Sequence, residues 1–283
     1  MRFLPIEFDR KTLTEYSQLF CECFPGASSR FTPDYLEWLY LANPDGRAVG
    51  FDAREGDTLA AHYVCVPARA RIDGQPVLLL LSLNTATRPQ FQGKGLFTKL
   101  AQLTYEAGAA AGFAGVYGVA NANSTPGFVR KLGFQLVRPL EAMVGMGGLG
   151  LAQPAAPRDL SFERVWSEDA LRWRCASPIN PIRCKTGNAV WQFFAPGLPM
   201  VSAYAELAPQ PGWQPVASGA PLSPLRLYLG LVPDAMRGFA SYADIPARLR
   251  PSPLNLIYRP LTAAPAQLDP AAIHFTFLDF DAY

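Results

Sequence analysis

The chain contains 283 residues, of which 49% are hydrophobic and 17% are charged, so its composition excludes an intrinsically disordered protein. Lys and Arg total 25 against 23 Asp and Glu, and the resulting net charge of +2 lacks the basic field that nucleic-acid binding requires. The longest aliphatic run, residues 77–81, is too short to cross a bilayer, and the N-terminal sequence MRFLPIEFDR lacks the apolar core of a signal peptide. We therefore expect a cytoplasmic protein with no membrane insertion and no nucleic-acid partner.

The first half of the chain alternates between helical and strand patterns. Leu13, Tyr16, Phe20 and Phe24 recur at helical spacing, and residues 77–87 begin as a nearly continuous apolar run typical of a central strand. Helix and strand alternate in the way that builds a mixed sheet covered on both faces, so we predict an α+β fold with a mixed α/β sheet. The expected helices are 11–24, 31–41, 96–110 and 125–132, and the expected strands are 48–53, 58–67, 77–87, 114–120 and 134–144.

The second half is richer in proline and has weaker patterns. A Gly-rich stretch at 145–150, followed by prolines at 154 and 157, is typical of a linker, so we expect domains at 1–147 and 151–283. The helix around Trp38 and the helix around Trp173 both lead to an Asn-Pro pair, which suggests a duplicated fold with a degenerate second copy. The expected strands are 162–166, 200–207, 225–231, 254–259 and 272–280, and the expected helices are 167–175, 186–194 and 234–249.

The five cysteines, at positions 21, 23, 65, 175 and 184, form no C-x-x-C pair, and the chain has only two histidines. An odd number of unpaired thiols is typical of a reducing compartment. We therefore expect neither a metal site nor a disulfide framework.

The segment 87–100 contains the sharpest motif, in which a strand leads into two glycines and an amphipathic helix leads out. Gly93 and Gly95 permit backbone conformations that other residues avoid. The first N–H groups of the following helix have no partner within the helix, and together with Lys94 they suit a diphosphate. The alternative is a simple turn. The segment is neither a P-loop nor a dinucleotide fingerprint.

This loop resembles the acyl-CoA signature of the GNAT (GCN5-related N-acetyltransferase) superfamily, Q/R-x-x-G-x-G/A. Gln92 and Gly95 match the signature, whereas Phe97 departs from its Gly or Ala. Residues 121–134 resemble the second signature of the family, in which a strand, an Asn and a short helix precede K-x-G-F. The resemblance covers residues 1–145 and implies that acetyl-CoA, or another acyl-CoA, is the acyl donor and that no metal is needed.

The resemblance also implies a GNAT fold in which the two central strands splay apart and the pantetheine arm lies between them. Backbone groups at the end of the first strand would pair with the pantetheine amides, and the glycine loop would hold the diphosphate. The implied cofactor-binding residues are Thr85, Ala86, Thr87, Gln92, Gly93, Lys94, Gly95, Leu96, Phe97, Asn123, Ser124, Phe128 and Lys131.

In the second half, residues 173–181 and 275–281 resemble two-domain GNAT proteins of bacterial surface-polysaccharide pathways. This resemblance implies a second, smaller GNAT-like domain that closes the acceptor side, and an acceptor that is a nucleotide-linked amino sugar. The chain has no second copy of the CoA loop. The alternatives are N-acetylation of another amine, such as an aminoglycoside or a peptide, and a non-catalytic module that senses acyl-CoA.

The catalytic candidates are His62, Asn84 and Tyr117. His62 on the strand 58–67 suits taking a proton from an ammonium group, or it bonds a neighbour in the core. Asn84 orients the acceptor or a water molecule, or it caps the splay. The family usually protonates the leaving thiolate from a Tyr at the position where this chain has Val129. Tyr117, Ser124 or water would then replace that acid, or no acid is needed.

The expected acceptor-binding residues are Trp38, Tyr40, Asp279 and Asp281. Asp279 and Asp281 alternate onto one face of the expected last strand and suit an ammonium group or sugar hydroxyls; the alternative is a pair of exposed carboxylates. Trp38 and Tyr40 line the acceptor pocket or belong to the core. Cys65 has no His or Asp partner pattern, so we expect direct attack by the amine without an acyl-enzyme.

Overall fold

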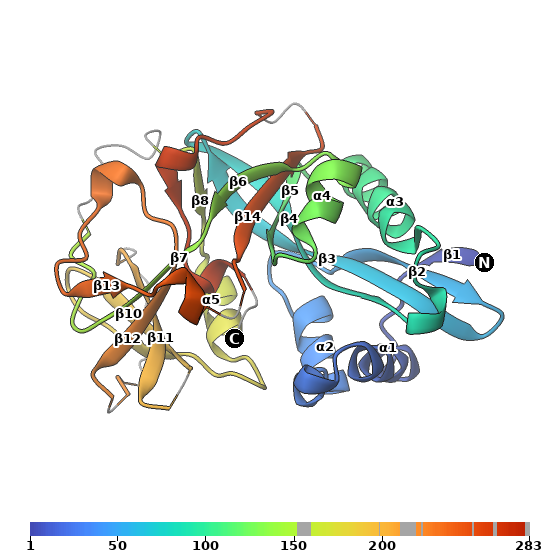
Figure 1. The fold of residues 1–283 in the computed structure, drawn as a ribbon, viewed down its shortest axis with the longest axis horizontal. Coiled ribbons are helices and arrows are strands. Elements are labelled where there is room, and N and C mark those ends of the chain that lie inside the picture. The colour runs from blue at the N-terminus through green and yellow to red at the C-terminus, as the bar shows by residue number, and fades with distance from the viewer. Residues whose placement is uncertain are drawn as a thin grey trace. The chain divides into compact units, whose positions relative to one another are not determined.

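The computed structural model describes residues 1–151, 160–197, 199–209, 219–221, 223–250, 252–262 and 265–280. The chain divides into two compact units, each discontinuous in sequence (Figure 1). The first unit comprises Met1–Ala68, Leu78–Leu136 and Ile257–Ala266, and the second comprises Arg69–Val77, Val137–Leu256 and Gln267–Tyr283. The linker expected near residue 150 falls within the second unit.

A mixed sheet forms the centre of the first unit, as expected. The strand order is β1-β2-β3-β4-β5-β14-β6. Strand β2 pairs with β1 and β3 in antiparallel fashion, whereas β4 and β5 are parallel. The bounds are β1 (Arg2–Pro5), β2 (Val49–Glu55), β3 (Thr58–Ile72), β4 (Gln75–Thr87), β5 (Gly115–Ala120), β6 (Gln135–Pro139) and β14 (Asn255–Pro260).

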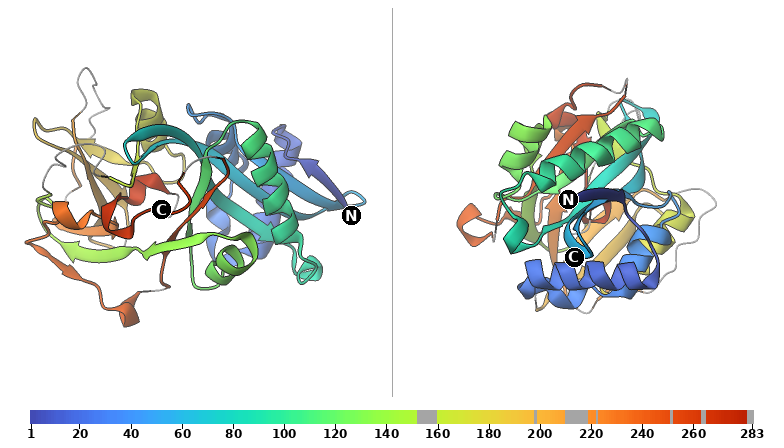
Figure 2. Two further views of the ribbon diagram at one scale, coloured as in Figure 1. Left: turned by 90° about the horizontal axis from the view of Figure 1, so that it is seen from above. Right: turned by 90° about the vertical axis from the view of Figure 1, so that its right-hand side faces the viewer.

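Two pairs of helices cover opposite faces of this sheet (Figures 1 and 2). Helices α1 (Arg10–Cys23) and α2 (Pro33–Leu41) contact each other on one face, and α3 (Leu96–Ala110) and α4 (Thr125–Leu132) contact each other on the other face. The Asp9 carboxylate begins α1 by accepting from the N–H groups of Lys11 and Thr12. Gly133, at φ +69°, ends α4.

The hydrophobic core beneath α3 and α4 explains why these segments fold against the sheet. Leu80 on β4, Leu100 on α3, Val116 on β5 and Phe134 all belong to one buried cluster. Each such side chain contributes about 1.5–3 kcal/mol when it leaves water. The apolar residues of 96–110 that recur at helical spacing therefore form the face of α3 that packs on the sheet.

The second unit has its own sheet in the order β13-β7-β12-β11-β10-β9, in which only the described neighbours β11 and β12 run parallel. The second sheet was expected from the family resemblance. Strand β15 pairs with β8, which also pairs with the end of β3. The bounds are β7 (Glu141–Gly145), β8 (Phe162–Arg164), α5 (Glu168–Cys175), β9 (Arg183–Lys185), β10 (Trp191–Pro196), β11 (Val201–Leu207), β12 (Leu225–Gly230), β13 (Tyr242–Asp244) and β15 (Ile273–His274).

Short 3-10 helices complete the described structure. They are Pro25–Arg30, Pro89–Phe91, Asp234–Met236, Ala247–Leu249, Pro270–Ala272 and Phe277–Asp279. Within the described ranges, no helix combines the length and apolar character that a membrane crossing needs.

Several expected elements of the second half are wrong. Residues 186–194 are not a helix, because Trp191 begins strand β10 and pairs across to Leu207. Residues 234–249 are not a helix either and contain two 3-10 turns and the short strand β13. The expected strand 272–280 ends after His274, because Thr276 caps a 3-10 helix. In the first half, residues 134–144 form two strands rather than one, and strand β1 was not expected.

Candidate functional site

Strands β4 and β5 part at a defined position. Their parallel pairing runs from Leu79–Gly115 to Ser82–Gly118, although β4 continues to Thr87 and β5 to Ala120. Among the described residues, no pair joins the two strands beyond Ser82 and Gly118. The expected splay of the central strands is therefore present, and its closed end lies at Ser82.

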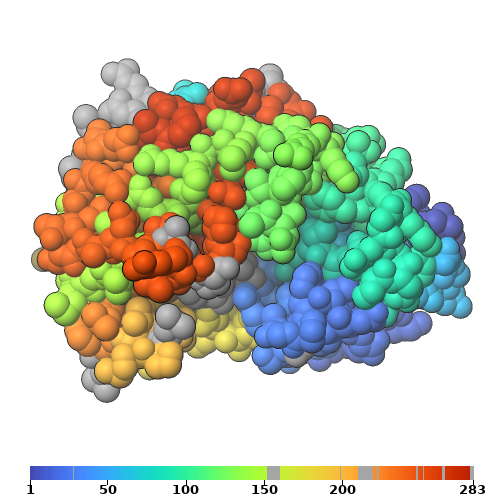
Figure 3. Space-filling view, viewed as in Figure 1, coloured from blue at the N-terminus to red at the C-terminus, as the bar shows by residue number. Residues whose placement is uncertain are grey.

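A cavity of about 770 Å³ lies in the first unit along the parted strands. Figure 3 shows a hollow on this face between the green segment that includes α4 and the blue segment that includes α1 and α2. The cavity wall is formed by residues 82–87 of β4, by the glycine turn and the start of α3, by residues 118–124 after the middle of β5, and by α4. Ile257 on β14 and residues Cys23 and Phe24 at the end of α1 also line the cavity.

The glycine turn forms one end of this cavity. Gly93 and Gly95 have φ values of +76° and +73°, a region that favours glycine, and a Cβ atom at either position would meet no atom within 4 Å. Gly95 is the N-cap of α3 and provides no side-chain cap, so the first N–H groups of this 15-residue helix face outward without a capping side chain. The Gln92 amide donates to the carbonyl of Thr87 at 3.2 Å and ties the turn to the end of β4.

The structure brings together twelve of the thirteen residues expected to bind the cofactor. All of them except Lys94 line the cavity. The Lys94 ammonium instead lies 5.0 Å from the centre of the Phe91 ring. Lys131 on α4 provides a cation in the cavity wall.

Phe97, the residue that departs from the family signature, has a compensating neighbour. Its ring packs edge-to-face on Phe128, with centroids 5.2 Å apart. A Cβ atom at Gly127 would stand 3.2 Å from the Phe97 ring. The absence of a side chain at Gly127 therefore makes room for the larger residue.

The three expected catalytic residues have different surroundings. Asn84 lines the cavity and has a φ of +45°, a left-handed conformation that Asn tolerates better than most residues. His62 is fully buried and does not belong to the cavity lining; its Nδ1 lies 2.7 Å from Oδ1 of Asp52, and its Nε2 lies 3.3 Å from the hydroxyl of Tyr40. Tyr117 is likewise fully buried and absent from the lining.

The expected acceptor-binding residues are not gathered in the cavity. Trp38 stacks on Tyr35 with ring centroids 5.7 Å apart, and Tyr40 is fully buried. Asp279 is buried and sits in a capping box, where its carboxylate accepts from the N–H and hydroxyl of Thr276 rather than facing outward from a strand. Asp281 lies outside the described residues.

The sequence interpretation assigned no role to several polar groups in the cavity wall, two of which have notable surroundings. The Ser82 hydroxyl lies 2.7 Å from that of Tyr63, which in turn lies 2.6 Å from that of Tyr105. The other group is the thiol of Cys23, whose pKa is raised by burial. Cys65, for which we expected no nucleophilic role, is fully buried, and burial raises its pKa to about 12, so it stays protonated at neutral pH.

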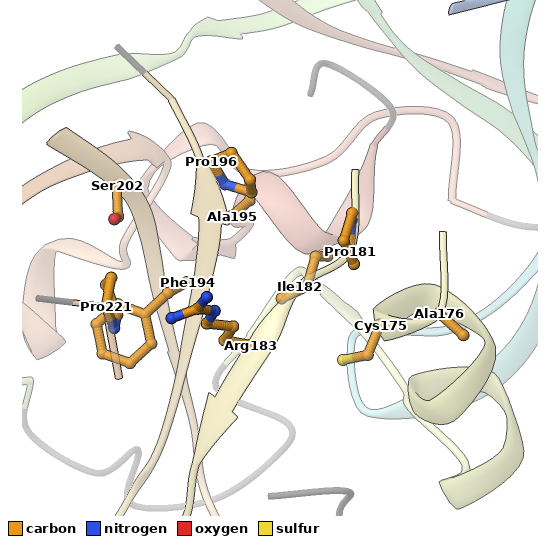
Figure 4. Close-up of a pocket in the computed structure, with 10 residues that line it drawn as sticks. All are labelled: Cys175, Ala176, Pro181, Ile182, Arg183, Phe194, Ala195, Pro196, Ser202 and Pro221. Carbon is orange, nitrogen blue, oxygen red and sulfur yellow. The ribbon is translucent and has the colours of Figure 1, made fainter. Parts of the chain in front are cut away.

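A second cavity, of about 630 Å³, lies within the second unit. Figure 4 shows the residues that line it, among them Ile182, Phe194 and Ser202. Burial raises the pKa of Cys175 to about 12, which leaves this thiol unreactive at neutral pH. In the described part of the chain, no three His, Cys, Asp or Glu side chains gather as metal ligands do.

Comparisons with known proteins agree with this geometry. Residues 6–137 match the family model of the acetyltransferase (GNAT) domain. The comparison with curated proteins finds no match. Among solved structures, the chain is similar to a GCN5-related N-acetyltransferase from Anabaena variabilis, with 12% identity over 92% of this chain and 73% of that chain and a TM-score of 0.60.

Two further structures share the fold. A GCN5-related N-acetyltransferase from Kribbella flavida has 14% identity, with 93% of this chain and 73% of that chain covered and a TM-score of 0.60. Eis1 from Mycobacterium abscessus has 12% identity, with 92% and 74% covered and a TM-score of 0.56. The match over residues 6–137 is consistent with the parted strands and the glycine turn, and these solved structures share the fold of the chain.

Proposed function

We propose that this protein transfers an acetyl group from acetyl-CoA to the primary amine of a small acceptor. The observation that carries the proposal is the cavity between the parted strands, which has uncapped N–H groups of α3 at one end and polar side chains at the other. Acetyl-CoA supplies the thioester in this reaction.

The residues present fit an acyl-CoA. The open space over Gly93 and Gly95 and the N-terminus of α3 suit a diphosphate, and Lys131 adds a positive charge. The backbone of residues 85–87 faces the cavity along the unpaired part of β4 and can pair with an extended amide chain as a neighbouring strand does.

The transfer is balanced without a further reactant. The amine nitrogen forms a bond to the acetyl carbon, the bond from that carbon to sulfur breaks, and CoA leaves as the thiol. The nitrogen loses one proton, and the thiolate of CoA takes up one proton, so the number of protons is unchanged. At the closed end, the hydroxyl of Ser82 is held by Tyr63 and is placed to donate a hydrogen bond to the sulfur as negative charge develops.

For the acceptor, we propose a nucleotide-linked amino sugar. This choice is supported by the resemblance of residues 173–181 and 275–281 to proteins that acylate such sugars. Other small amines, including aminoglycosides, are the alternative acceptors with which these sugars are to be compared.

The experiment uses the full chain. Calorimetry measures CoA binding, and a thiol-reactive dye measures CoA release with acetyl-CoA and a panel of nucleotide-linked amino sugars, aminoglycosides and short peptides. We expect binding and release with at least one amine. Tight CoA binding without release across the panel would indicate an acyl-CoA sensor, and failure to bind CoA would overturn the proposal.

A further inference from the structure

A chain of buried hydrogen bonds leads from the interior of the first unit to Asn84. The carboxylate of Asp52 accepts from the hydroxyl of Tyr16 at 2.7 Å and lies 2.7 Å from Nδ1 of His62. On the other side of the imidazole, Nε2 lies 3.3 Å from the hydroxyl of Tyr40. The side-chain amide of Asn84 donates to that same hydroxyl at 3.1 Å.

The hydrogen-bond roles are defined at the two ends of this chain. A carboxylate only accepts, so Nδ1 of His62 carries a hydrogen atom, and Nε2 is the ring nitrogen that faces the hydroxyl of Tyr40. The hydroxyl of Tyr40 is thus held at Nε2, and its oxygen accepts a hydrogen bond from the side-chain N–H of Asn84. The amide nitrogen of Asn84 is thus bonded to Tyr40, which lies outside the cavity lining, and its amide oxygen is left as the acceptor.

Asn84 lies in the cavity wall close to the point where β4 and β5 part. Asn84 is two residues beyond Ser82, the last paired residue of β4, and it lines the cavity, whereas Tyr40 and His62 do not. Its φ of +45° departs from the extended strand at this point. Within the described part of the chain, no protein group donates to its amide oxygen.

We propose that the amide oxygen of Asn84 accepts the N–H of the acceptor amine, and that Asp52, His62 and Tyr40 are positioning residues that keep this oxygen turned toward the cavity. The inference rests on the proposed N-acetyltransferase function. A neutral amide oxygen holds an amine without favouring its ammonium form, whereas a carboxylate would favour the charged form, which cannot attack.

The first test is a pair of substitutions at Asn84. We expect Asn84→Ala to raise KM for the amine about tenfold, equivalent to one lost hydrogen bond, and to leave CoA affinity unchanged. We expect Asn84→Asp to lower KM and kcat together at neutral pH, with kcat recovering as pH rises and the ammonium group loses its proton. If amine KM and kcat in Asn84→Ala equal those of the wild type, the inference is overturned.

The second test separates positioning from a purely structural role. Tyr40→Phe should raise amine KM in the wild-type background but have no further effect in the Asn84→Ala background, because Tyr40 acts through Asn84. Tyr258→Phe is the matched control, since it removes a buried hydroxyl that bonds the carbonyl of Pro265 away from the cavity lining. Additive effects of Tyr40→Phe and Asn84→Ala, or equal KM changes in Tyr40→Phe and Tyr258→Phe, would contradict the positioning role.

A readout independent of turnover distinguishes this inference from the proposed function. In an NMR spectrum of the ¹⁵N-labelled chain, the side-chain amide signal of Asn84 is identified by its loss in Asn84→Ala. Tyr40→Phe should shift that signal, and Tyr258→Phe should leave it in place. An unshifted signal in Tyr40→Phe overturns the inference even when the wild type is active. A shifted signal from a wild type that releases no thiol supports the network and rejects the transferase function.

Discussion

Gly118 stands opposite Ser82 at the last paired position of β4 and β5, and a Cβ atom at residue 118 would lie 3.3 Å from the Cβ of Ser82. A side chain at residue 118 would therefore crowd Ser82 at the closed end of the splay. We expect Ser82→Ala to lower kcat about tenfold, the equivalent of one hydrogen bond, while the dissociation constant of CoA stays unchanged. Steady-state kinetics with calorimetry of CoA binding measures both quantities.

The control for Ser82→Ala is Thr104→Val. The Thr104 hydroxyl is buried and donates to the carbonyl of Leu100 within α3, outside the cavity lining. This substitution should change stability without changing kcat. An equal loss of kcat in both variants would show that Ser82 acts only through the packing of the core.

The glycine turn is tested by a pair of positive-φ glycines. Gly95→Val should lower CoA affinity at least tenfold, because a β-branched residue at φ +73° distorts the turn and fills the space over the N-terminus of α3. Gly112 after α3 has a φ of +86° and equally open surroundings, but it lies outside the cavity lining. Gly112→Val should therefore cost similar stability and keep CoA affinity. Calorimetry measures the CoA affinity of both variants, and their melting temperatures measure the loss of stability. Unchanged CoA affinity in Gly95→Val would reject the diphosphate site.

Cys23 provides a chemical probe of the cavity. Its thiol is half-buried in the cavity wall, and burial raises its pKa, so alkylation by iodoacetamide should be slow at neutral pH and accelerate above the ordinary thiol pKa. CoA should protect Cys23 from this reaction. Cys21 on the same helix is also half-buried but lies outside the lining, so CoA should leave its modification unchanged. Peptide mass spectrometry compares the two sites, and unprotected Cys23 would argue against CoA in this cavity.

Asp279 should make the stability of the second unit depend on pH. Burial raises the pKa of its carboxyl, although the charge of Arg164 and the hydrogen bonds from Thr276 act in the opposite direction. The folded chain therefore holds this proton more tightly than the unfolded chain does. The resulting stabilisation is present below the unfolded-state pKa and is lost as pH rises through the folded-state pKa.

The variant Asp279→Asn removes this titration and keeps an acceptor oxygen for Thr276. As pH rises from the unfolded-state pKa of about 3.9 through the higher folded-state pKa, the wild type should lose unfolding free energy relative to the variant, by about 1.4 kcal/mol for each unit of pKa shift. Urea unfolding at several pH values measures the difference. Parallel curves for the two proteins would contradict the assignment.

The sequence predicted well those parts of the fold in which the signal is local. The apolar face of 96–110 gave the bounds of α3, and the glycines at 93 and 95 marked the turn before it. The same local signal misled at Trp191 and Phe193, whose alternating burial belongs to strand β10 although residues 186–194 were interpreted as a helix. Thr276 ended the expected last strand, because its hydroxyl competes for backbone N–H groups.

The polar contacts of the candidate site could not be derived from the sequence, because they join residues far apart in the chain. Asp52 meets His62 across the pairing of β2 and β3, and Tyr40 reaches them from α2. Ser82 meets Tyr63 from the neighbouring strand. Periodicity indicates which face of an element is buried, but it does not indicate which hydroxyl or imidazole completes a neighbour's hydrogen bonds.

Strand β14 has a consequence for how the protein is made. It sits between β5 and β6 in the first sheet, and its Ile257 forms part of the cavity wall, yet it is translated more than a hundred residues after its neighbours. On the ribosome, β5 therefore retains an open edge until residues 255–260 emerge, and such an edge invites pairing with other chains. A fragment released near residue 150 would carry the entire glycine turn and still be unable to finish its own sheet.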